Sequence, residues 1–137
     1  MITGSCLCGG VAYRITGALQ PIQLCHCQQC RKAQGTPFVS NIPVLRSQFE
    51  LLRGTDLLKE YSASEGKGRV FCIHCGSPLY SHRFNDPTVI RLRAGTLDQN
   101  LASRPAFHAY TDSAANWWLI NDDLPQYAQA APTTSEK

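Results

Sequence analysis

The chain of 137 residues carries a formal net charge of +3 at pH 7, and 43% of its residues are hydrophobic while 17% are charged. This composition is typical of a single globular domain and excludes a disordered or fibrous chain. Because the basic residues are scattered and no apolar stretch approaches the roughly 20 residues of a membrane helix, we expect neither nucleic-acid binding nor a membrane span.

The chain contains seven cysteines, which stand in close groups. An odd number of cysteines grouped in this way favours metal binding in a reducing compartment over a framework of disulfides. The N-terminus also lacks the pattern of a signal peptide. We therefore expect a cytoplasmic protein whose cysteines hold metal ions.

Residues 2–15 predict two short strands joined by a tight turn that carries Cys6 and Cys8. The cysteines of a C-x-C pair share one face of a straight strand without necessarily converging. Gly9 and Gly10 follow them and permit the positive φ that lets both sulfurs reach one ion. The turn is therefore a candidate chelating pair.

Residues 19–24 predict a strand that enters the run Cys25, Cys27 and Cys30, after which a helical turn ends at Gly35. The C-x-C-x2-C spacing is too tight for ordinary disulfides, which need Cα atoms about 4.4 to 6.8 Å apart with converging side chains. If a helix begins near Cys27, Cys27 and Cys30 share one face and Cys25 folds in from the strand. We expect three thiolates around one zinc, with the fourth position open to water or substrate.

The alternative is a closed structural site whose fourth ligand comes from elsewhere in the chain. Spacing favours none of the four histidines that are candidates for this ligand: His26, His74, His82 and His108. Either His26 or His108 could also protonate a developing alkoxide, but we expect a packing role for each. The sequence therefore assigns no catalytic acid or base.

The middle of the chain predicts strands at residues 37–44, 49–53 and 57–61. A β-meander is their simplest arrangement. Residues 62–68 are polar and contain glycine, which is typical of an exposed hairpin tip. Residues 69–80 predict a strand, a C-x2-C-G knuckle formed by Cys72, Cys75 and Gly76, and another strand. This knuckle is typical of zinc ribbons and related structural sites.

Two strands are predicted in the later part of the chain. Residues 88–93 alternate in the manner of a core strand, with Arg91 and Arg93 directed outward. Residues 107–110 predict one more short strand.

Trp117 and Trp118 are adjacent in the last apolar segment. Because neighbouring strand residues point to opposite faces, we expect one tryptophan to pack in the core and the other to line a groove. Residues 129–137 have almost nothing to bury, which predicts a flexible tail after a single domain of residues 1–128.

The seven cysteines form three clusters in the sequence, and these clusters must be divided among the metal sites. The economical division joins the two outer pairs into a closed four-thiolate site and leaves the middle run as a three-thiolate site. Spacing alone would also permit the knuckle to join the middle run, with the first pair left free.

The chain resembles the glutathione-dependent formaldehyde-activating enzyme family, also called the CENP-V/GFA domain, in five motifs between residues 3 and 127: S-C-L-C-G-G-V-x-Y, C-H-C-x-x-C-R-K-A-x-G, F-C-x-x-C-G-S-P-L-Y, A-G-T-L-D and W-x-L-I-x-D-D-L-P-Q-Y. The resemblance implies a mainly β fold, a β-tent of packed antiparallel sheets. It also implies two zinc ions per chain, a structural one at Cys6, Cys8, Cys72 and Cys75 and a second one at Cys25, Cys27 and Cys30.

The resemblance further implies a carbon–sulfur lyase that condenses glutathione with formaldehyde to S-hydroxymethylglutathione, so that its partners are a small thiol and an aldehyde. A thiol bound to zinc is held as a thiolate near neutral pH and can attack a carbonyl carbon. Arg31 and Lys32 could offset the negative charge of such a site. Family members often carry a lysine where this chain has Ala114, and its absence predicts weaker binding of an anionic thiol. The competing function is a non-catalytic, zinc-stabilised module that binds a thiol or another protein.

Overall fold

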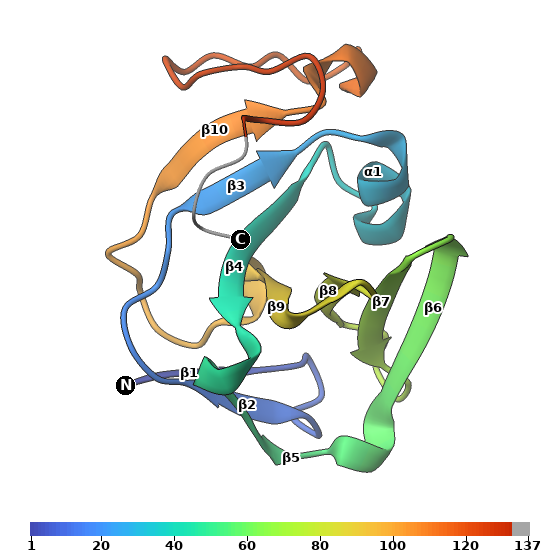
Figure 1. Ribbon diagram of the computed structural model, residues 1–137, viewed down its shortest axis with the longest axis vertical. Coiled ribbons are helices and arrows are strands. Elements are labelled where there is room, and N and C mark those ends of the chain that lie inside the picture. The colour runs from blue at the N-terminus through green and yellow to red at the C-terminus, as the bar shows by residue number, and fades with distance from the viewer. Residues whose placement is uncertain (133–137) are drawn as a thin grey trace.

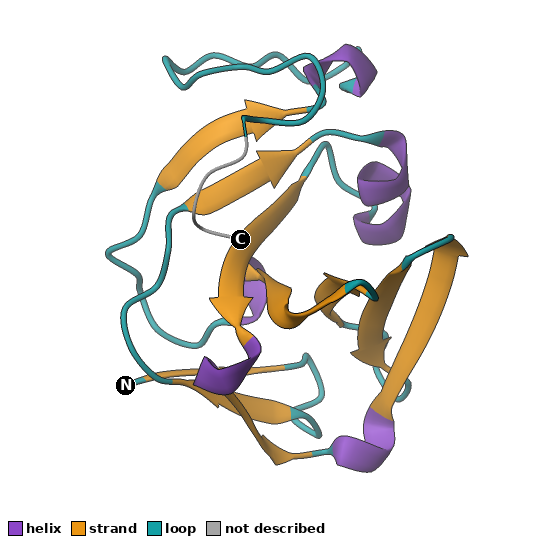
Figure 2. Cartoon of the chain, viewed as in Figure 1, coloured by secondary structure: helices purple, strands orange, loops and turns teal. Residues whose placement is uncertain are grey.

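The structure, a computed structural model, describes residues 1–132 of the chain. Over these residues the chain forms two β-sheets and one α-helix, and the fold is mainly β as the sequence predicts (Figures 1 and 2). The remaining residues of the predicted tail, 133–137, lie outside the described part. No helix among the described residues is long and apolar enough to cross a membrane.

The smaller sheet has three strands in the order β1-β2-β5, and their bounds are Ile2–Ser5 (β1), Ala12–Ile15 (β2) and Phe49–Arg53 (β5). β1 and β2 form the predicted antiparallel hairpin, and β5 pairs antiparallel with β2. This sheet forms the lower part of the molecule in Figure 1.

The larger sheet has seven strands in the order β10-β3-β4-β9-β8-β7-β6. Their bounds are Ile22–Cys25 (β3), Val39–Leu45 (β4), Leu58–Ser64 (β6), Lys67–Cys72 (β7), Pro78–Arg83 (β8), Asp86–Arg93 (β9) and Pro105–Ala109 (β10). The sheet curves from β10 and β3 on one side of the molecule to β7 and β6 on the other (Figure 1).

Helical segments stand at the ends of strands. The α-helix, α1, spans Gln28–Gln34 and ends at Gly35, as the sequence predicts. Four short 3-10 helices within the described residues span Arg46–Gln48 (η1), Thr55–Leu57 (η2), Ala94–Thr96 (η3) and Thr111–Ser113 (η4). α1 lies above the upper ends of β7 and β6 in Figure 1.

Two pairings differ from the expected antiparallel meander. β5 and β6 follow each other in sequence but belong to different sheets, because Gly54 and η2 redirect the chain between them. β10 pairs parallel with β3, with His108 opposite Leu24. Parallel neighbours need a long connection, and here that connection contains most of the sheet, so local sequence does not indicate the pairing.

The hydrophobic core lies between the two sheets. Tyr13 and Ile15 from β2 enter the same buried cluster as Ile42 from β4 and Ile90 from β9. Tyr13 is fully buried, and its ring stacks on Phe49 at 5.1 Å between centroids. Burying side chains of this size contributes about 1.5 to 3 kcal/mol each, so this packing holds the sheets together.

Two expectations about orientation are wrong. Arg93 is buried rather than directed outward, because its guanidinium donates hydrogen bonds to Asn41, Gln34 and Ser81 across the sheet. Trp117 and Trp118 lie in a turn rather than a strand, so alternation does not apply, and neither packs in the core. Their exposed fractions are 67% and 47%.

Candidate metal centres

Four cysteine sulfurs from the two sheets meet at one point. Cys6 and Cys8 come from the turn between β1 and β2, while Cys72 and Cys75 come from the knuckle between β7 and β8. The four sulfurs all lie within 4.8 Å of one another. Bonds of about 2.3 Å to a tetrahedral zinc would place sulfurs about 3.8 Å apart, so this donor set fits zinc.

The backbone around these sulfurs is shaped to support thiolates. Val11 N and Gly10 N donate to the sulfurs of Cys6 and Cys8 at 3.2 and 3.4 Å. Hydrogen bonds from Ser77 lower the pKa of Cys75 to about 5. Backbone N–H groups directed at sulfur favour its charged form, which is the form that binds a metal.

The two turns reach the metal position through left-handed backbone. Gly9 and Gly76 have φ values of 77° and 81°, which favour residues without a Cβ. Ser77 also joins the turns directly, because its Oγ accepts a hydrogen bond from Leu7 N at 2.9 Å. The four-cysteine cluster therefore links the small sheet to the large one.

Three further cysteine sulfurs meet at the start of α1. Cys25 is the last residue of β3, Cys27 is the N-cap of α1, and Cys30 lies in its first turn. The Sγ atoms of Cys25 and Cys30 are 3.5 Å apart, and Cys27 Sγ accepts a hydrogen bond from Cys30 N. All three sulfurs lie within 4.8 Å of one another, so this donor set also fits a metal ion.

The sulfurs of this three-cysteine cluster shift one another's pKa. The neighbouring sulfurs of Cys25 and Cys27 lower the pKa of Cys30, whereas Cys27 and Cys30 raise the pKa of Cys25. Cys30 is 2% exposed, so its charge is held largely away from bulk water.

Cations from β7 and β9 face this charge. Arg69 Nη2 lies 3.9 Å from Cys30 Sγ. Lys67 and Arg93 interact electrostatically with Cys30, although burial lowers the pKa of both groups. The sequence analysis assigned charge compensation to Arg31 and Lys32, next to the cysteines in sequence. The structure adds cations from β7 and β9, which are distant from Cys30 in sequence and which only the tertiary fold brings near.

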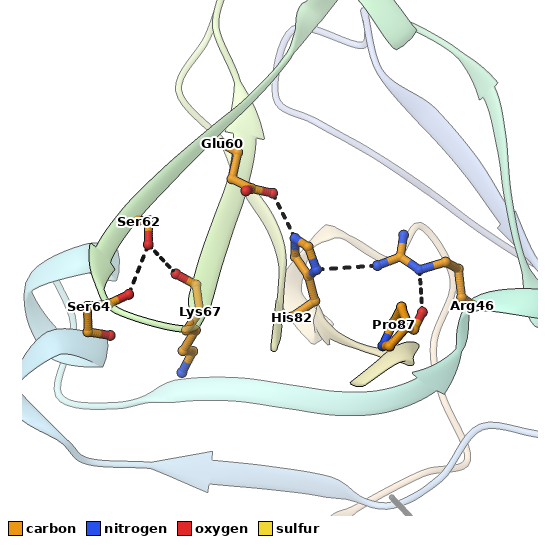
Figure 3. Close-up of polar contacts among 7 residues, drawn as sticks. All are labelled: Arg46, Glu60, Ser62, Ser64, Lys67, His82 and Pro87. Atoms are coloured by element: carbon orange, nitrogen blue, oxygen red, sulfur yellow. Dashed lines mark hydrogen bonds and ion pairs between the residues drawn. The ribbon is translucent and has the colours of Figure 1, made fainter. Parts of the chain in front are cut away.

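Hydrogen bonds from Ser62 stabilise the tip of the β6–β7 hairpin, which carries Lys67. Ser62 Oγ donates to the backbone oxygens of both Ser64 and Lys67, at 2.9 and 2.7 Å (Figure 3). On the other side of the hairpin, Glu60 contacts His82, which in turn contacts Arg46 (Figure 3). His82 is thereby engaged away from the three sulfurs, and His74 is exposed. None of the histidines joins either cysteine cluster among the described residues.

The two remaining histidines are buried, and they connect to an exposed aspartate, Asp122. His26 and His108 are 0% and 2% exposed, and their rings contact each other. His108 Nε2 lies 3.0 Å from Asp122. His26 N also donates to Ala109 O, so these contacts fasten the segment between Cys25 and Cys27 to β10. Asp122 lies in the D-D-L-P motif, which is the one local signal that could have indicated it.

A pocket of about 260 Å³ lies between α1 and strands β6 to β9, and no cysteine of the three-cysteine cluster lines it. Arg69 belongs to both places, because it lines the pocket and also contacts Cys30. Its Nη1 atom is buried and has no hydrogen-bond partner within residues 1–132. The arrangement can hold a metal ion on one side of Arg69 and an organic molecule on the other.

Comparisons with known proteins agree with this architecture. A family model described as glutathione-dependent formaldehyde-activating enzyme matches residues 1–113. A Rhodobacter sphaeroides protein of known crystal structure superposes with a TM-score of 0.62 at 20% identity, covering 76% of this chain and 99% of that protein. At this identity the likeness concerns the fold alone.

Two curated proteins are similar in sequence. A Schizosaccharomyces pombe protein described as an uncharacterized lyase is 27% identical over 77 residues, which are 56% of this chain and 54% of that protein. The chain thus matches only about half of that relative. A Halomonas elongata protein, provisionally named a glutathione-dependent formaldehyde-activating enzyme, is 27% identical over 126 residues, covering 85% of this chain and 79% of that protein.

Proposed function

Because this chain belongs to the glutathione-dependent formaldehyde-activating enzyme family, we propose that it is a carbon–sulfur lyase that adds a thiol to a small aldehyde. Glutathione is the proposed thiol and formaldehyde the simplest aldehyde. The observation that carries the proposal is the convergence of three cysteine sulfurs, one of which contacts the pocket residue Arg69, since three protein ligands on zinc leave one position for substrate.

We propose two zinc ions per chain with different roles. The four-cysteine cluster has a full set of ligands and acts as a structural site. The three-cysteine cluster of Cys25, Cys27 and Cys30 would hold the second zinc, which lowers the pKa of a bound thiol and keeps it ionised near neutral pH. All seven cysteines are free thiols, which supports work in a reducing compartment such as the cytoplasm.

The residues of the chain would then act on the aldehyde. The thiol sulfur forms a bond to the carbonyl carbon while the C=O π bond breaks, and the oxygen gains negative charge before it takes a proton. Arg69 Nη2 lies 3.9 Å from Cys30 Sγ and the side chain lines the pocket, so its guanidinium is placed to donate a hydrogen bond to that oxygen. Lys67 and Arg93 stabilise the negative charge of the loaded site.

The test must separate catalysis from binding, because thiols and formaldehyde also combine without an enzyme. Exchange spectroscopy by NMR measures the rate at which S-hydroxymethylglutathione and its components interconvert at equilibrium. We expect the zinc-loaded protein to accelerate this exchange and Cys30→Ser to abolish the acceleration. A protein that binds glutathione without accelerating exchange would instead be the non-catalytic thiol-binding module.

A second pair of variants tests the role of Arg69. Arg69→Met should lower the exchange rate by about a hundredfold, the usual loss for one donor to a developing oxyanion. Arg83→Met is the matched control, because Arg83 is exposed on β8 and does not line the pocket of Arg69. Equal rates for the two variants would remove Arg69 from the mechanism.

A further inference from the structure

The pocket beside Arg69 is larger than formaldehyde requires. Its volume is about 260 Å³. A cavity of about 150 Å³ is enough to hold a benzene molecule, and one molecule of liquid water occupies about 30 Å³. Formaldehyde has only one carbon and one oxygen, so it would leave most of this space to water. The size fits a ring or a branched chain.

The lining of the pocket is mainly apolar. Aliphatic or aromatic groups come from α1 and from strands β6, β7 and β8: Ala33, Tyr61, Val70, Phe71, Pro78 and Tyr80. Water gains few hydrogen bonds from such walls, so an apolar group that displaces it is favoured by about 25 cal/mol for each Å² it buries. The walls therefore select apolar ligands over polar ones.

The strongly polar side chains that line the pocket are few. Besides Gln34, they are the guanidinium groups of Arg69 and Arg93. Arg93 is already occupied, because it donates to Gln34, Asn41 and Ser81. Arg69 retains a buried Nη1 with no partner among the described residues. Arg69 lines the pocket, so its guanidinium can face the oxygen of a ligand held there.

Arg69 also relates the pocket to the reacting sulfurs. Its Nη2 lies 3.9 Å from Cys30 Sγ, so an oxygen bound by this guanidinium stands near the three-cysteine cluster. We propose that the pocket receives the apolar, ring-sized substituent of an aldehyde whose carbonyl oxygen faces Arg69, and that the chain accepts aromatic or branched aliphatic aldehydes besides formaldehyde. This inference rests on the proposed function and specifies the substrate class of the same site.

The chemistry is the same addition with a larger carbonyl compound. The sulfur of the thiol forms one bond to the carbonyl carbon, the C=O π bond becomes a C–O single bond, and the proton of the thiol ends on that oxygen. The product is a hemithioacetal, and no oxidant or reductant is needed.

The thiol itself is the less suitable occupant of the pocket. Glutathione carries two carboxylates and two peptide groups, and burying such groups without hydrogen-bond partners is unfavourable. With Arg93 occupied, Arg69 is the one pocket cation with an unpartnered buried atom among the described residues. The apolar substituent of an aldehyde therefore suits the apolar lining of the pocket better than the charged peptide glutathione does.

A binding experiment tests the pocket without using activity. Benzyl alcohol resembles benzaldehyde in shape but does not react with thiols, and its binding to the zinc-loaded chain can be followed by NMR. We expect contacts between its ring protons and those of Tyr61 and Phe71. Ala33→Phe should weaken binding at least about tenfold, because Ala33 is an exposed helix residue whose enlargement fills the pocket. Phe84→Ala is the control, since Phe84 is exposed but does not line the pocket.

An exchange experiment then compares benzaldehyde with formaldehyde, using glutathione as the thiol in both cases. We expect acceleration of both reactions, and Ala33→Phe should lower the benzaldehyde-to-formaldehyde ratio of kcat/KM by at least about tenfold. The inference is overturned if benzyl alcohol does not bind at millimolar concentration, or if Ala33→Phe lowers both reactions equally.

The two proposals fail in different ways. Acceleration with formaldehyde alone would reject the larger substrate class and leave the proposed lyase function in place. Acceleration with neither aldehyde would reject both proposals, whether or not benzyl alcohol binds.

Discussion

His26 Nε2 lies 2.8 Å from His108 Nδ1, in a contact between two buried imidazole rings at the parallel pair β3 and β10. A hydrogen bond of this length needs one ring to donate and the other to accept. His108 Nε2 contacts the Asp122 carboxylate, which accepts, so Nε2 is the nitrogen of His108 that carries hydrogen. Its Nδ1 then accepts from Nε2–H of His26.

The first prediction is therefore the tautomer of both rings. Burial lowers the pKa of His26 and the hydrogen bond from His108 lowers that of Asp122, so His26 is a neutral ring and Asp122 a carboxylate near neutral pH. Long-range 1H–15N NMR spectra should show the Nε2–H tautomer for both histidines. His74, which is exposed, is the control and should not show one fixed tautomer. A hydrogen on Nδ1 of His108 would contradict the assignment.

The second prediction concerns the unequal structural weight of the two cysteine clusters. Cys72 and Cys75 meet Cys6 and Cys8 across the two sheets, whereas the three-cysteine cluster is local in sequence. A structural zinc contributes on the order of 10 kcal/mol of apparent binding free energy, which is comparable with the whole stability of a domain. Cys75→Ser should therefore unfold the chain.

Cys30→Ser is the matched comparison for that variant. It should lower the zinc content from two ions per chain to one, measured by metal analysis, while circular dichroism still shows the folded protein. Equal losses of melting temperature in the two variants would contradict this division of roles. One zinc per wild-type chain after expression with excess zinc would show that the three-cysteine cluster is not a zinc site.

The third prediction concerns the contact between β1 and the buried ring of Tyr13. Gly4 packs so closely on this ring that an added Cβ would overlap it. Gly4→Ala should lower the free energy of unfolding by about 1 to 3 kcal/mol, the usual cost of overpacking a core. Gly95→Ala is the control, because a Cβ there meets no atom within 4 Å. Urea unfolding measures both, and similar stability of the two variants would contradict the contact.

The fourth prediction is a loss of stability at alkaline pH through Tyr13. Burial raises the pKa of this phenol from 10.0 to about 12. Between these values the unfolded chain has lost the proton that the folded chain keeps, so the free energy of unfolding falls as pH rises. The loss amounts to about 2 to 3 kcal/mol across the window.

Tyr13→Phe should remove this part of the pH dependence, even though it also deletes the 2.6 Å hydrogen bond to Thr96. Tyr61→Phe, at a tyrosine that is 62% exposed, should leave the alkaline slope unchanged. The measurement is urea unfolding at several pH values above and below 10. The same slope in Tyr13→Phe and the wild type would assign the alkaline loss to other groups.

Local chemistry explains what could be predicted. The spacing of cysteines and glycines at Cys6, Cys8, Cys72 and Cys75 indicates two chelating turns, and the structure places both turns at strand ends. Helix α1 and its end at Gly35 also follow from residues that are neighbours in sequence. Trp117 and Trp118 show the limit of this reasoning, because alternation between faces holds only where the backbone is extended.

The sequence by itself determined the mainly β class, the family and the residues available as metal ligands, because each depends on residue types at short spacing. Only the tertiary structure decided what surrounds those ligands. Arg69 reaches Cys30 across 39 residues of chain, and His108 reaches His26 across 82. The physical reason is strand pairing. β10 pairs with β3, and the β6–β7 hairpin lies opposite α1. The charged and buried groups around the metal ligands therefore come from segments that are distant in sequence, and short-range sequence patterns do not predict that these segments meet.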